Sequence, residues 1–269
     1  MRGWFSRDYE PVVSVDPGES VSFHSYAAFW WWDRDVEPER PEGAGHALYG
    51  PIDVRGARAG QTLVVRIEEI EPRDWGRTWA EGEAFAWSLA GDTWRLGGRA
   101  VRSAPFLGVI GMPPPEPGEH PTTPPRRWGG NIDCKELVAG ATLYLPIPVD
   151  GALLMAGDGH GAQGDGEVSG TAIECPLESA TLTLDVEDRE LRSPIARTAD
   201  SWLAFGFDED LDAAAEQATE TMLDVMEREL GASRKEALAL ASVAVDLRVT
   251  QVVNQVKGVH AVLRDGAIR

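Results

Sequence analysis

Short apolar runs alternate with turn-forming residues over most of the chain. Between residue 12 and about residue 184, segments such as VVSV, TLVVRIEEI, TLYLPIPV and ATLTLDV are separated by Pro, Gly and Asp, which is the pattern of strands joined by turns. In segment 62–70 the apolar residues Leu63, Val65 and Ile67 occupy every second position, so one face of that strand is expected to be buried. The pattern predicts a strand-rich core.

The pattern changes to a helical one after Phe207. Apolar residues then recur near helical spacing, with Asp208 predicted to cap the first helix and Gly231 to end it. Ser233 and Glu236 stand in the capping-box relation, which predicts a second helix directly afterwards.

Strand composition returns in segments 249–253 (VTQVV) and 259–263 (VHAVL). We therefore expect a mainly β protein in which residues 1–207 form a β-rich core that carries the functional site. Residues 208–269 are expected to form a smaller α+β portion packed on the same core.

The segment of residues 112–127, MPPPEPGEHPTTPPRR, is too rich in proline for a helix or strand. It is predicted to be a long loop. A loop of this length is either a spacer or a functional lid, and the sequence leaves both open.

Composition excludes several classes of partner. With 25 Lys and Arg against 44 Asp and Glu, the net charge of −19 repels nucleic acid and anionic lipid. The N-terminus carries no apolar signal-like region, and no segment approaches the roughly 18 consecutive apolar residues of a spanning helix, so we expect a cytoplasmic protein. Two cysteines are too few for a disulfide scaffold.

A dense polar segment lies at residues 157–170, GDGHGAQGDGEVSG. Carboxylates and an imidazole, from Asp158, His160, Asp165 and Glu167, stand among glycines that permit close backbone approach. Asp158 and His160 would share one face of an extended segment, as in half of a divalent-metal site. The alternative is that Asp and Gly make turns and His160 is an ordinary hydrogen-bonded side chain.

A second polar segment, GGNIDCKEL, follows the proline-rich loop at residues 129–137. Alternation would place Asn131, Asp133 and Lys135 on one side of a short strand, where charged side chains need partners or a metal. Either Asp133 and Lys135 form structural pairs, or Asp133 completes the metal site and Lys135 polarises a substrate.

Neither cysteine lies in a recognisable nucleophile motif. Cys134 and Cys175 are interpreted as small buried hydrophobic residues rather than as catalytic groups. Phosphate-binding and dinucleotide-binding motifs are likewise not found in the sequence.

Three blocks resemble the acetamidase/formamidase family: GPIDVRGARAGQTLVVRIEEI at residues 50–70, GGNIDCKELVAGATLYLPIPVDGALLMAGDGHGAQGDGEVSGTAIE at 129–174 and DLRVTQVVNQVKGVHAVL at 246–263. The resemblance implies a fold of sandwich-like and small barrel-like β units and a homodimer or higher homo-oligomer. It also implies hydrolysis of formamide, acetamide or similar small amides to the carboxylate and ammonia. Divalent metals, notably zinc or calcium, are associated with the family.

The polar positions that match the family's motifs are Asn131, Asp133, Asp158, His160, Gln163 and Glu167. Roles for these six and for Lys135 are hypotheses. We expect Asp133, Asp158 and His160 to bind the metal, which we take to be zinc, with calcium as the alternative. Glu167 is the candidate proton carrier, assisted by Lys135. Asn131 and Gln163 are the candidates for substrate binding.

The chain departs from the family near its N-terminus. In SYAAFWWWDRD, residues 25–35, Ala27 stands where an acidic residue is expected, and Trp30, Trp31 and Trp32 stand where glycines are expected. The tryptophans either pack or make an oligomer contact, or they reshape a substrate-binding wall toward an aromatic or larger ligand. Three functions stay open: a short-amide hydrolase, an enzyme of the same fold acting on a larger or aromatic amide or pathway intermediate, and a non-catalytic binding homologue.

Overall fold

Three β-sheets and two helices make up the computed structural model, in the part of the chain that it describes, residues 1–36 and 39–269. The five-stranded sheet has the order β1-β3-β12-β9-β10. Its strands are β1 (Val13–Val15), β3 (Leu48–Val54), β9 (Phe106–Gly111), β10 (Gly129–Asn131) and β12 (Leu154–His160).

The eight-stranded sheet has the order β16-β17-β15-β14-β11-β4-β13-β2, with antiparallel pairing throughout. Its strands are β2 (Ser20–Ser25), β4 (Thr62–Pro72), β11 (Thr142–Pro146), β13 (Leu177–Glu187), β14 (Ile195–Arg197), β15 (Ser201–Asp208), β16 (Val245–Gln251) and β17 (Lys257–Arg264).

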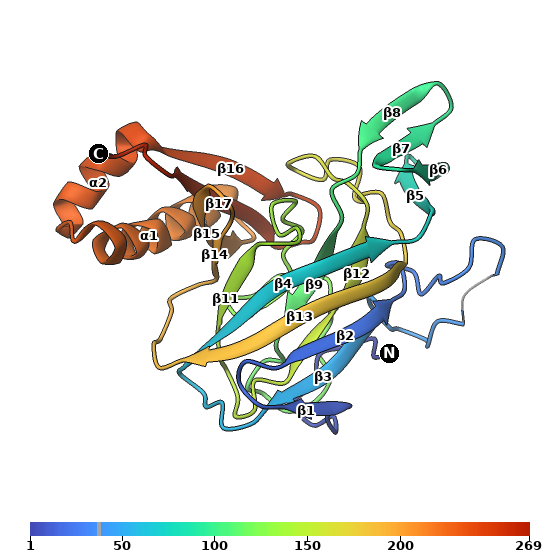
Figure 1. Ribbon diagram of the computed structural model, residues 1–269, viewed down its shortest axis with the longest axis horizontal. Helices are drawn as coiled ribbons and strands as arrows, with labels where there is room; N and C mark the ends of the chain where they lie inside the picture. The colour runs from blue at the N-terminus through green and yellow to red at the C-terminus, as the bar shows by residue number, and fades with distance from the viewer. Residues whose placement is uncertain (37–38) are drawn as a thin grey trace.

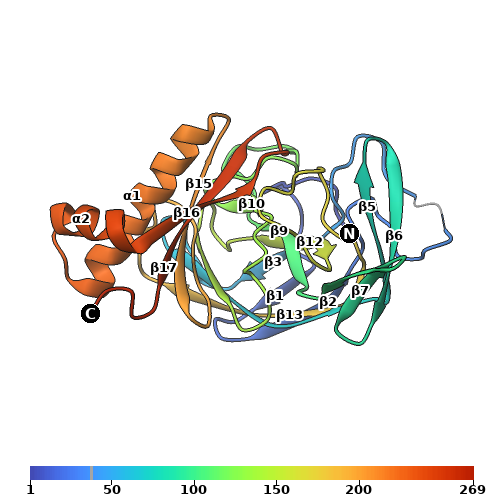
Figure 2. The same cartoon turned by 90° about the horizontal axis from the view of Figure 1, so that it is seen from above.

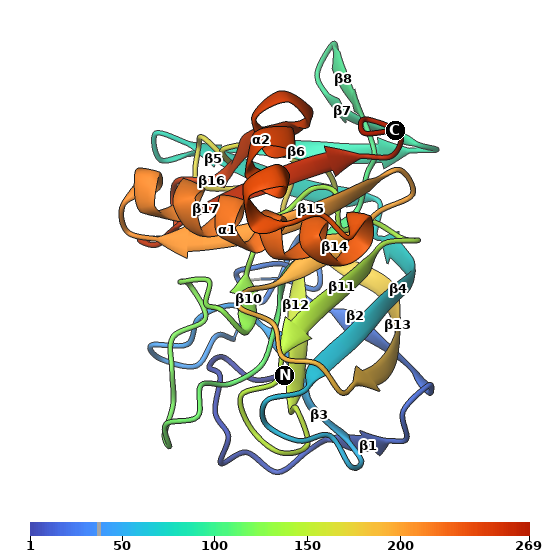
Figure 3. The ribbon, with the colours of Figure 1, turned by 90° about the vertical axis from the view of Figure 1, so that its left-hand side faces the viewer.

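The remaining elements lie at the two ends of the molecule, as Figures 1 and 2 show. A four-stranded sheet projects at one end: β5 (Trp75–Ala80), β6 (Glu83–Ala90), β7 (Thr93–Leu96) and β8 (Arg99–Arg102). At the other end the helices α1 (Leu211–Leu230) and α2 (Arg234–Ala244) cover part of the eight-stranded sheet, in front of β14 and β15 in Figure 3.

The main core lies between the five-stranded and eight-stranded sheets. Ile52 and Leu107 from the first sheet and Leu63, Val65 and Leu182 from the second are buried in one apolar cluster. The two-residue period of β4 therefore does bury one face, because its apolar positions face the opposing sheet. The predicted mainly β, sandwich-like fold is confirmed.

Both C-terminal helices form, with one difference at the first cap. The carboxylate of Asp210, not that of Asp208, accepts hydrogen bonds from the backbone N–H groups of Asp212 and Ala213. Asp208 is instead the last residue of β15. Gly231 ends α1 in the left-handed conformation, and Ser233 caps α2, as predicted.

The C-terminal portion continues the main sheet. β17 pairs with β15, and β16 pairs with β17. The strands of residues 208–269 therefore extend the same eight-stranded sheet that residues 1–207 begin. Its helices have a second apolar cluster of their own against β15 and β17. Neither helix in the described part of the chain is long and apolar enough to span a bilayer.

Candidate active site

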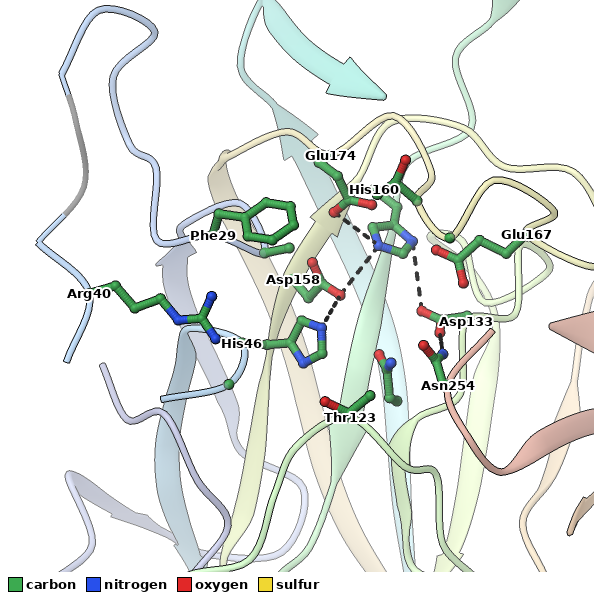
Figure 4. Close-up of a pocket in the computed structure, with 15 residues that line it drawn as sticks. Phe29, Arg40, His46, Thr123, Asp133, Asp158, His160, Glu167, Glu174 and Asn254 are labelled. Atoms are coloured by element: carbon green, nitrogen blue, oxygen red, sulfur yellow. Dashed lines mark hydrogen bonds and ion pairs between the residues drawn. The ribbon is translucent and has the colours of Figure 1, made fainter. Parts of the chain in front are cut away.

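A cavity of about 180 Å³ opens near the ends of β10 and β12. Strand β12 supplies Asp158 and His160, Asn131 ends β10, and Asp133 follows it closely. Because these strands flank β9 in one sheet, side chains that are far apart in sequence meet here (Figure 4).

Loops close the rest of the cavity. The loop after β12 contributes Glu167 and Glu174, and the turn between β16 and β17 contributes Asn254. The loops before β3 contribute Phe29 and His46. The other lining residues are Ala28, Arg40, Gly45, Thr123, Gly170 and Thr171, of which Thr123 belongs to the proline-rich loop, so that loop forms part of the cavity wall.

Three acidic residues of the cavity have unusual backbone conformations. Asp133, Asp158 and Glu167 have φ angles of 53°, 61° and 45°, in the left-handed region that residues with a Cβ rarely adopt. Such conformations cost free energy and gather at functional sites, where the surroundings enforce them. The positive φ angles of these three residues accompany side chains that line the cavity.

His160 lies at the centre of the acidic side chains. Its Nε2 is 3.3 Å from Oδ2 of Asp158 and 3.4 Å from Oε2 of Glu174. Its Nδ1 is 3.1 Å from Oε1 of Gln163 and 4.0 Å from Oδ1 of Asp133. On the far side of Asp158, Nε2 of His46 lies 3.9 Å from Oδ2 (Figure 4). One imidazole is therefore within reach of three carboxylates.

Gly108 of β9 forms the floor on which these groups converge. A Cβ placed there would lie 2.7 Å from Cε1 of His160, 2.8 Å from Oδ2 of Asp158 and 2.9 Å from Oδ1 of Asp133. Contacts this short are steric clashes, so the approach of the three side chains depends on a residue with no side chain.

Several buried oxygen atoms around the cavity are unsatisfied. Among the described residues, no hydrogen-bond partner is found for Oδ1 of Asn131, Asp133 and Asp158 or for Oε2 of Glu167 and Glu174. All five residues are at most 6% exposed. Buried acceptors without donors are costly, and in an acidic site a bound cation is the partner that removes the cost.

The pKa values of the side chains in the cavity reflect their burial and the closeness of several carboxylates. Burial raises the pKa of Asp133 to about 7 and that of Glu174 to about 7. Burial and then the charge of Asp133 raise the pKa of Glu167 to about 10. Burial alone lowers the pKa of His160, but the charges of Glu174 and Asp158 outweigh it and raise that pKa well above its usual range.

Asp158 is the exception among the four acids. Burial by itself raises its pKa, but the charges of His160 and His46 outweigh burial and hold the pKa at about 2. Asp158 is therefore the most stable carboxylate of the set and the acid best placed to hold positive charge.

The structure brings together most of the polar residues singled out in the sequence. Asp133, Asp158 and His160 present ligand atoms within 4.8 Å of one another, and His160, Glu167 and Glu174 form a second such group. Asn131 lines the same cavity.

Gln163 and Lys135 have different surroundings. Gln163 donates from Nε2 to the backbone carbonyl of Asp133 and contacts His160 through Oε1, so it orients two of the cavity's residues. Nζ of Lys135 lies 3.1 Å from Oδ1 of Asp165, and Lys135 is not among the described residues that line the cavity. The expected alternation ends because Asp133 leaves the extended conformation.

The three tryptophans, Trp30, Trp31 and Trp32, lie in the loop between β2 and β3. None of them belongs to the described lining of the cavity. Trp30 donates from Nε1 to the carbonyl of Gly45, at 2.9 Å. Arg77 lies over the ring of Trp31 and Arg73 over that of Trp32. The part of this segment that reaches the cavity is Ala28 and Phe29, whereas Ala27 is fully buried.

Sequence reasoning did not single out three residues that complete the site. Glu174 stands at the end of the second resembling block, and Asn254 lies in the third, where it donates to Oδ2 of Asp133. His46 lies in a glycine-rich segment, GAGHALYG, just before the first block. The density of Gly around a histidine was a usable signal for His46, but the role of Asn254 depends on a long-range contact.

The donor set fits a divalent cation. Two groups of three potential ligands share His160, one with Asp133 and Asp158 and the other with Glu167 and Glu174, and the four acids carry unsatisfied buried oxygens. The excess of oxygen over nitrogen suits hard or borderline cations, which include calcium and zinc.

The fold and the cavity together define a β-sandwich protein with a buried acid–histidine site for a small ligand. The model of the Acetamidase/Formamidase family matches residues 118–199, which include most of these side chains. An acetamidase from Bacillus halodurans is 31% identical in sequence. Its structure superposes with a TM-score of 0.89, over 97% of this chain and 94% of that chain. The chain belongs to the acetamidase/formamidase family.

Curated relatives match over less of their length. The acetamidase of Mycolicibacterium smegmatis is 48% identical over 48 residues, which cover 18% of this chain and 12% of that protein. A putative formamidase of Schizosaccharomyces pombe is 26% identical over 226 residues, which cover 56% of this chain and 55% of that protein. The longer of these two matches, to the putative formamidase, thus spans about half of that protein's length.

Proposed function

We propose that this protein hydrolyses a short carboxamide, of the formamide or acetamide type, to the carboxylate and ammonia, with the help of a divalent cation. The observation that carries the proposal is the set of five buried, unsatisfied oxygen atoms facing one cavity beside His160, where the part of the chain described provides no donor for them. Membership of the family supports the reaction class.

Asp133, Asp158 and His160 are the residues proposed to hold the cation, with Glu174 close enough to join them. The cation would displace to solvent the proton that the surrounding carboxylates keep on His160. Zinc is our first candidate and calcium the alternative. A divalent cation bound there supplies positive charge that polarises a carbonyl oxygen and lowers the pKa of a water molecule. Gln163 and Asn254 hold His160 and Asp133 in place through hydrogen bonds.

The size of the cavity supports a small substrate. Sites for drug-sized ligands have volumes of about 300–1,000 Å³, above the 180 Å³ found here. Phe29 supplies an apolar wall and Asn131 a polar one, which matches an amide with a short acyl group.

Hydrolysis requires that an oxygen of water bond to the carbonyl carbon and that the carbon–nitrogen bond break as the nitrogen gains a proton. Glu167 is proposed to carry that proton from the water to the departing nitrogen, because its Oε2 is buried at the cavity and has no partner in the described structure. The pKa of about 10 belongs to the cavity without a cation, and the positive charge of a bound cation would lower it and let Glu167 accept the proton. The side-chain amide of Asn131 would orient the substrate. Lys135 could act on this reaction only through Asp165, with which it pairs.

The test is ammonia release from formamide, acetamide, propionamide and an aromatic amide, measured before chelation, after chelation and after zinc or calcium is added back. Turnover of the small amides that is lost on chelation and restored by one cation is the expected result. If the protein retains metal but releases no ammonia from any small amide, the proposal fails, and an altered substrate or a binding role replaces it.

The homo-oligomeric state implied by the family resemblance and the cytoplasmic location expected from the apolar pattern of the sequence stay predictions. Light scattering after size-exclusion chromatography measures the first, and a mass of 29.2 kDa, that of one chain, would contradict it.

A further inference from the structure

A second cluster of metal-ligating side chains lies beside the candidate active site but outside it. It consists of Cys134, Glu136 and His260 and is referred to below as the thiol cluster. Cys134 follows directly after Asp133, yet neither Cys134 nor Glu136 lines the acidic cavity in the described structure. The proposed amide hydrolysis makes no use of these three residues.

The potential ligand atoms of the thiol cluster converge. Sγ of Cys134 lies 3.2 Å from Oε2 of Glu136, and Nε2 of His260 lies 3.7 Å from the same oxygen. All three atoms lie within 4.8 Å of one another. Cys134 and His260 are both fully buried, so their positions are fixed by packing.

His260 points to a missing ligand. Its Nε2 is buried and has no hydrogen-bond partner in the part of the chain that the structure describes. Its Nδ1 lies 2.8 Å from Oγ1 of Thr250. A metal-binding histidine is ordinarily held in this way, with one ring nitrogen fixed by a hydrogen bond and the other turned to the metal.

The surrounding charges leave room for a cation. Nη1 of Arg248 contacts Oε1 of Glu136, at 2.6 Å, and leaves Oε2 facing Cys134 and His260. Arg248 and Lys135 both pair with Asp165, and Arg248 also pairs with Glu136, so two positive charges face two carboxylates there and the thiolate of Cys134 would supply the further negative charge for a cation. Glu136 and Arg248 also line a second cavity, of about 410 Å³, which gives an ion a path from solvent.

We propose that the thiol cluster is a second metal site, which binds a borderline-soft divalent cation such as Zn²⁺ through Sγ of Cys134, Oε2 of Glu136 and Nε2 of His260. Binding releases the thiol proton of Cys134 to solvent, and water from the second cavity completes the coordination. One thiolate, one imidazole and one carboxylate form a ligand set that zinc accepts.

The distances agree with such a site. Tetrahedral zinc with ordinary bond lengths separates a sulfur from a carboxylate oxygen by about 3.6 Å and an imidazole nitrogen from that oxygen by about 3.4 Å. The corresponding distances here are 3.2 Å and 3.7 Å. Shifts of a few tenths of an ångström would bring these two pairs into range, and Sγ of Cys134 and Nε2 of His260 lie within 4.8 Å of each other.

Cobalt titration tests the proposal, because Co²⁺ bound to a thiolate has an intense charge-transfer absorption in the near ultraviolet that oxygen and nitrogen ligands do not give. The full-length protein is stripped of metal and titrated with Co²⁺, while bound cobalt is counted by mass spectrometry. We expect the absorption to appear and to saturate at one thiolate-bound cobalt per chain, while the total bound cobalt also includes any ion in the acidic cavity. Because the acidic cavity offers no sulfur among its described lining, the band reports the thiol cluster whether or not the protein hydrolyses amides.

Matched cysteine variants locate the band. Cys134→Ser, which keeps the side chain's size, should abolish the absorption and one equivalent of bound cobalt. Cys175→Ser, at the other buried free cysteine, should retain both. Glu136→Gln should weaken cobalt binding by about tenfold or more. The proposal is overturned if the unaltered protein gives no band in excess Co²⁺, which would make the three residues a hydrogen-bonded cluster and nothing more. It is also overturned if Cys175→Ser removes the band, or if Glu136→Gln leaves the affinity unchanged.

Discussion

The acidic cavity and the thiol cluster are neighbours, because both include residues of the segment 131–137, but they differ in the ligand atoms that they offer a cation. The acidic cavity offers oxygen from Asp133, Asp158 and neighbouring acids, with one imidazole. The thiol cluster offers sulfur, nitrogen and one oxygen. A hard cation such as calcium suits only the first set, whereas zinc is accepted by both, so the two regions differ in which ions besides zinc they can bind.

They also differ in how the backbone builds them. The acidic cavity requires three acidic residues in the left-handed region and a glycine beneath them. Among the described residues, none of the three in the thiol cluster has a positive φ. Strain therefore marks the site at which we propose the reaction, whereas the thiol cluster is built from ordinary strand and loop geometry.

One hairpin links the two regions. Asn254, in the turn between β16 and β17, donates to Asp133, while His260, within β17, faces Glu136. A structural change at the thiol cluster can thus alter the acidic cavity through this hairpin. The predictions below distinguish effects on the acidic cavity from effects on the thiol cluster.

The largest effect is expected for His160→Ala. The variant should lose the cation of the acidic cavity and about 10⁴-fold in turnover, since several kcal/mol of charge stabilisation disappear with it. Metal content and ammonia release measure both. The cobalt–thiolate absorption of the thiol cluster should remain, and full activity in the variant would refute the role assigned to His160.

Glu167→Gln should separate metal binding from chemistry. The glutamine keeps the shape of the side chain but cannot carry a proton, so kcat should fall about 10³-fold while metal content is unchanged. A parallel loss of metal would instead make Glu167 a ligand, as its proximity to His160 and Glu174 permits.

Gly108→Ala should disturb the acidic cavity alone. Its Cβ would meet Asp133, Asp158 and His160 at less than 3 Å, so we expect about 10²-fold lower turnover and about 1–3 kcal/mol lower stability. Gly98→Ala is the matched control, because no atom lies within 4 Å of a Cβ there. Equal effects of the two substitutions on turnover would contradict the convergence over Gly108.

The sequence could predict the parts of this site that depend on local spacing. Asp158 and His160 are two residues apart within β12 and do meet, with Nε2 of His160 3.3 Å from Oδ2 of Asp158. The extended conformation assumed for the segment is interrupted at Asp158, which has a φ of 61°. The predicted strands of the main core followed from the same period, as in β4.

What the sequence could not predict depends on backbone bends and long-range contacts. Lys135 was grouped with Asn131 and Asp133 on the assumption of an extended chain, but the positive φ of Asp133 ends that register, and Lys135 pairs with Asp165 instead. His46 and Asn254 reach the cavity from loops that tertiary packing places there. The cap of α1 moved from Asp208 to Asp210 for a similar reason, because pairing with β17 extends β15 as far as Asp208.

The smallest effect is expected for a substitution of Phe29 in the wall of the acidic cavity. It tests whether the aromatic segment of residues 29–32 sets the size of the substrate. Phe29 lines the cavity and packs edge-on against Trp79, with ring centroids 5.1 Å apart. Phe29→Ala should widen the wall and raise kcat/KM for propionamide relative to formamide by about tenfold, since pocket contacts of this kind discriminate by 1–3 kcal/mol. Trp32→Ala is the control, because Trp32 packs on His24, Tyr26 and Arg73. A shift in the ratio for Trp32→Ala with none for Phe29→Ala would mean that the tryptophans, and not Phe29, set the size of the substrate.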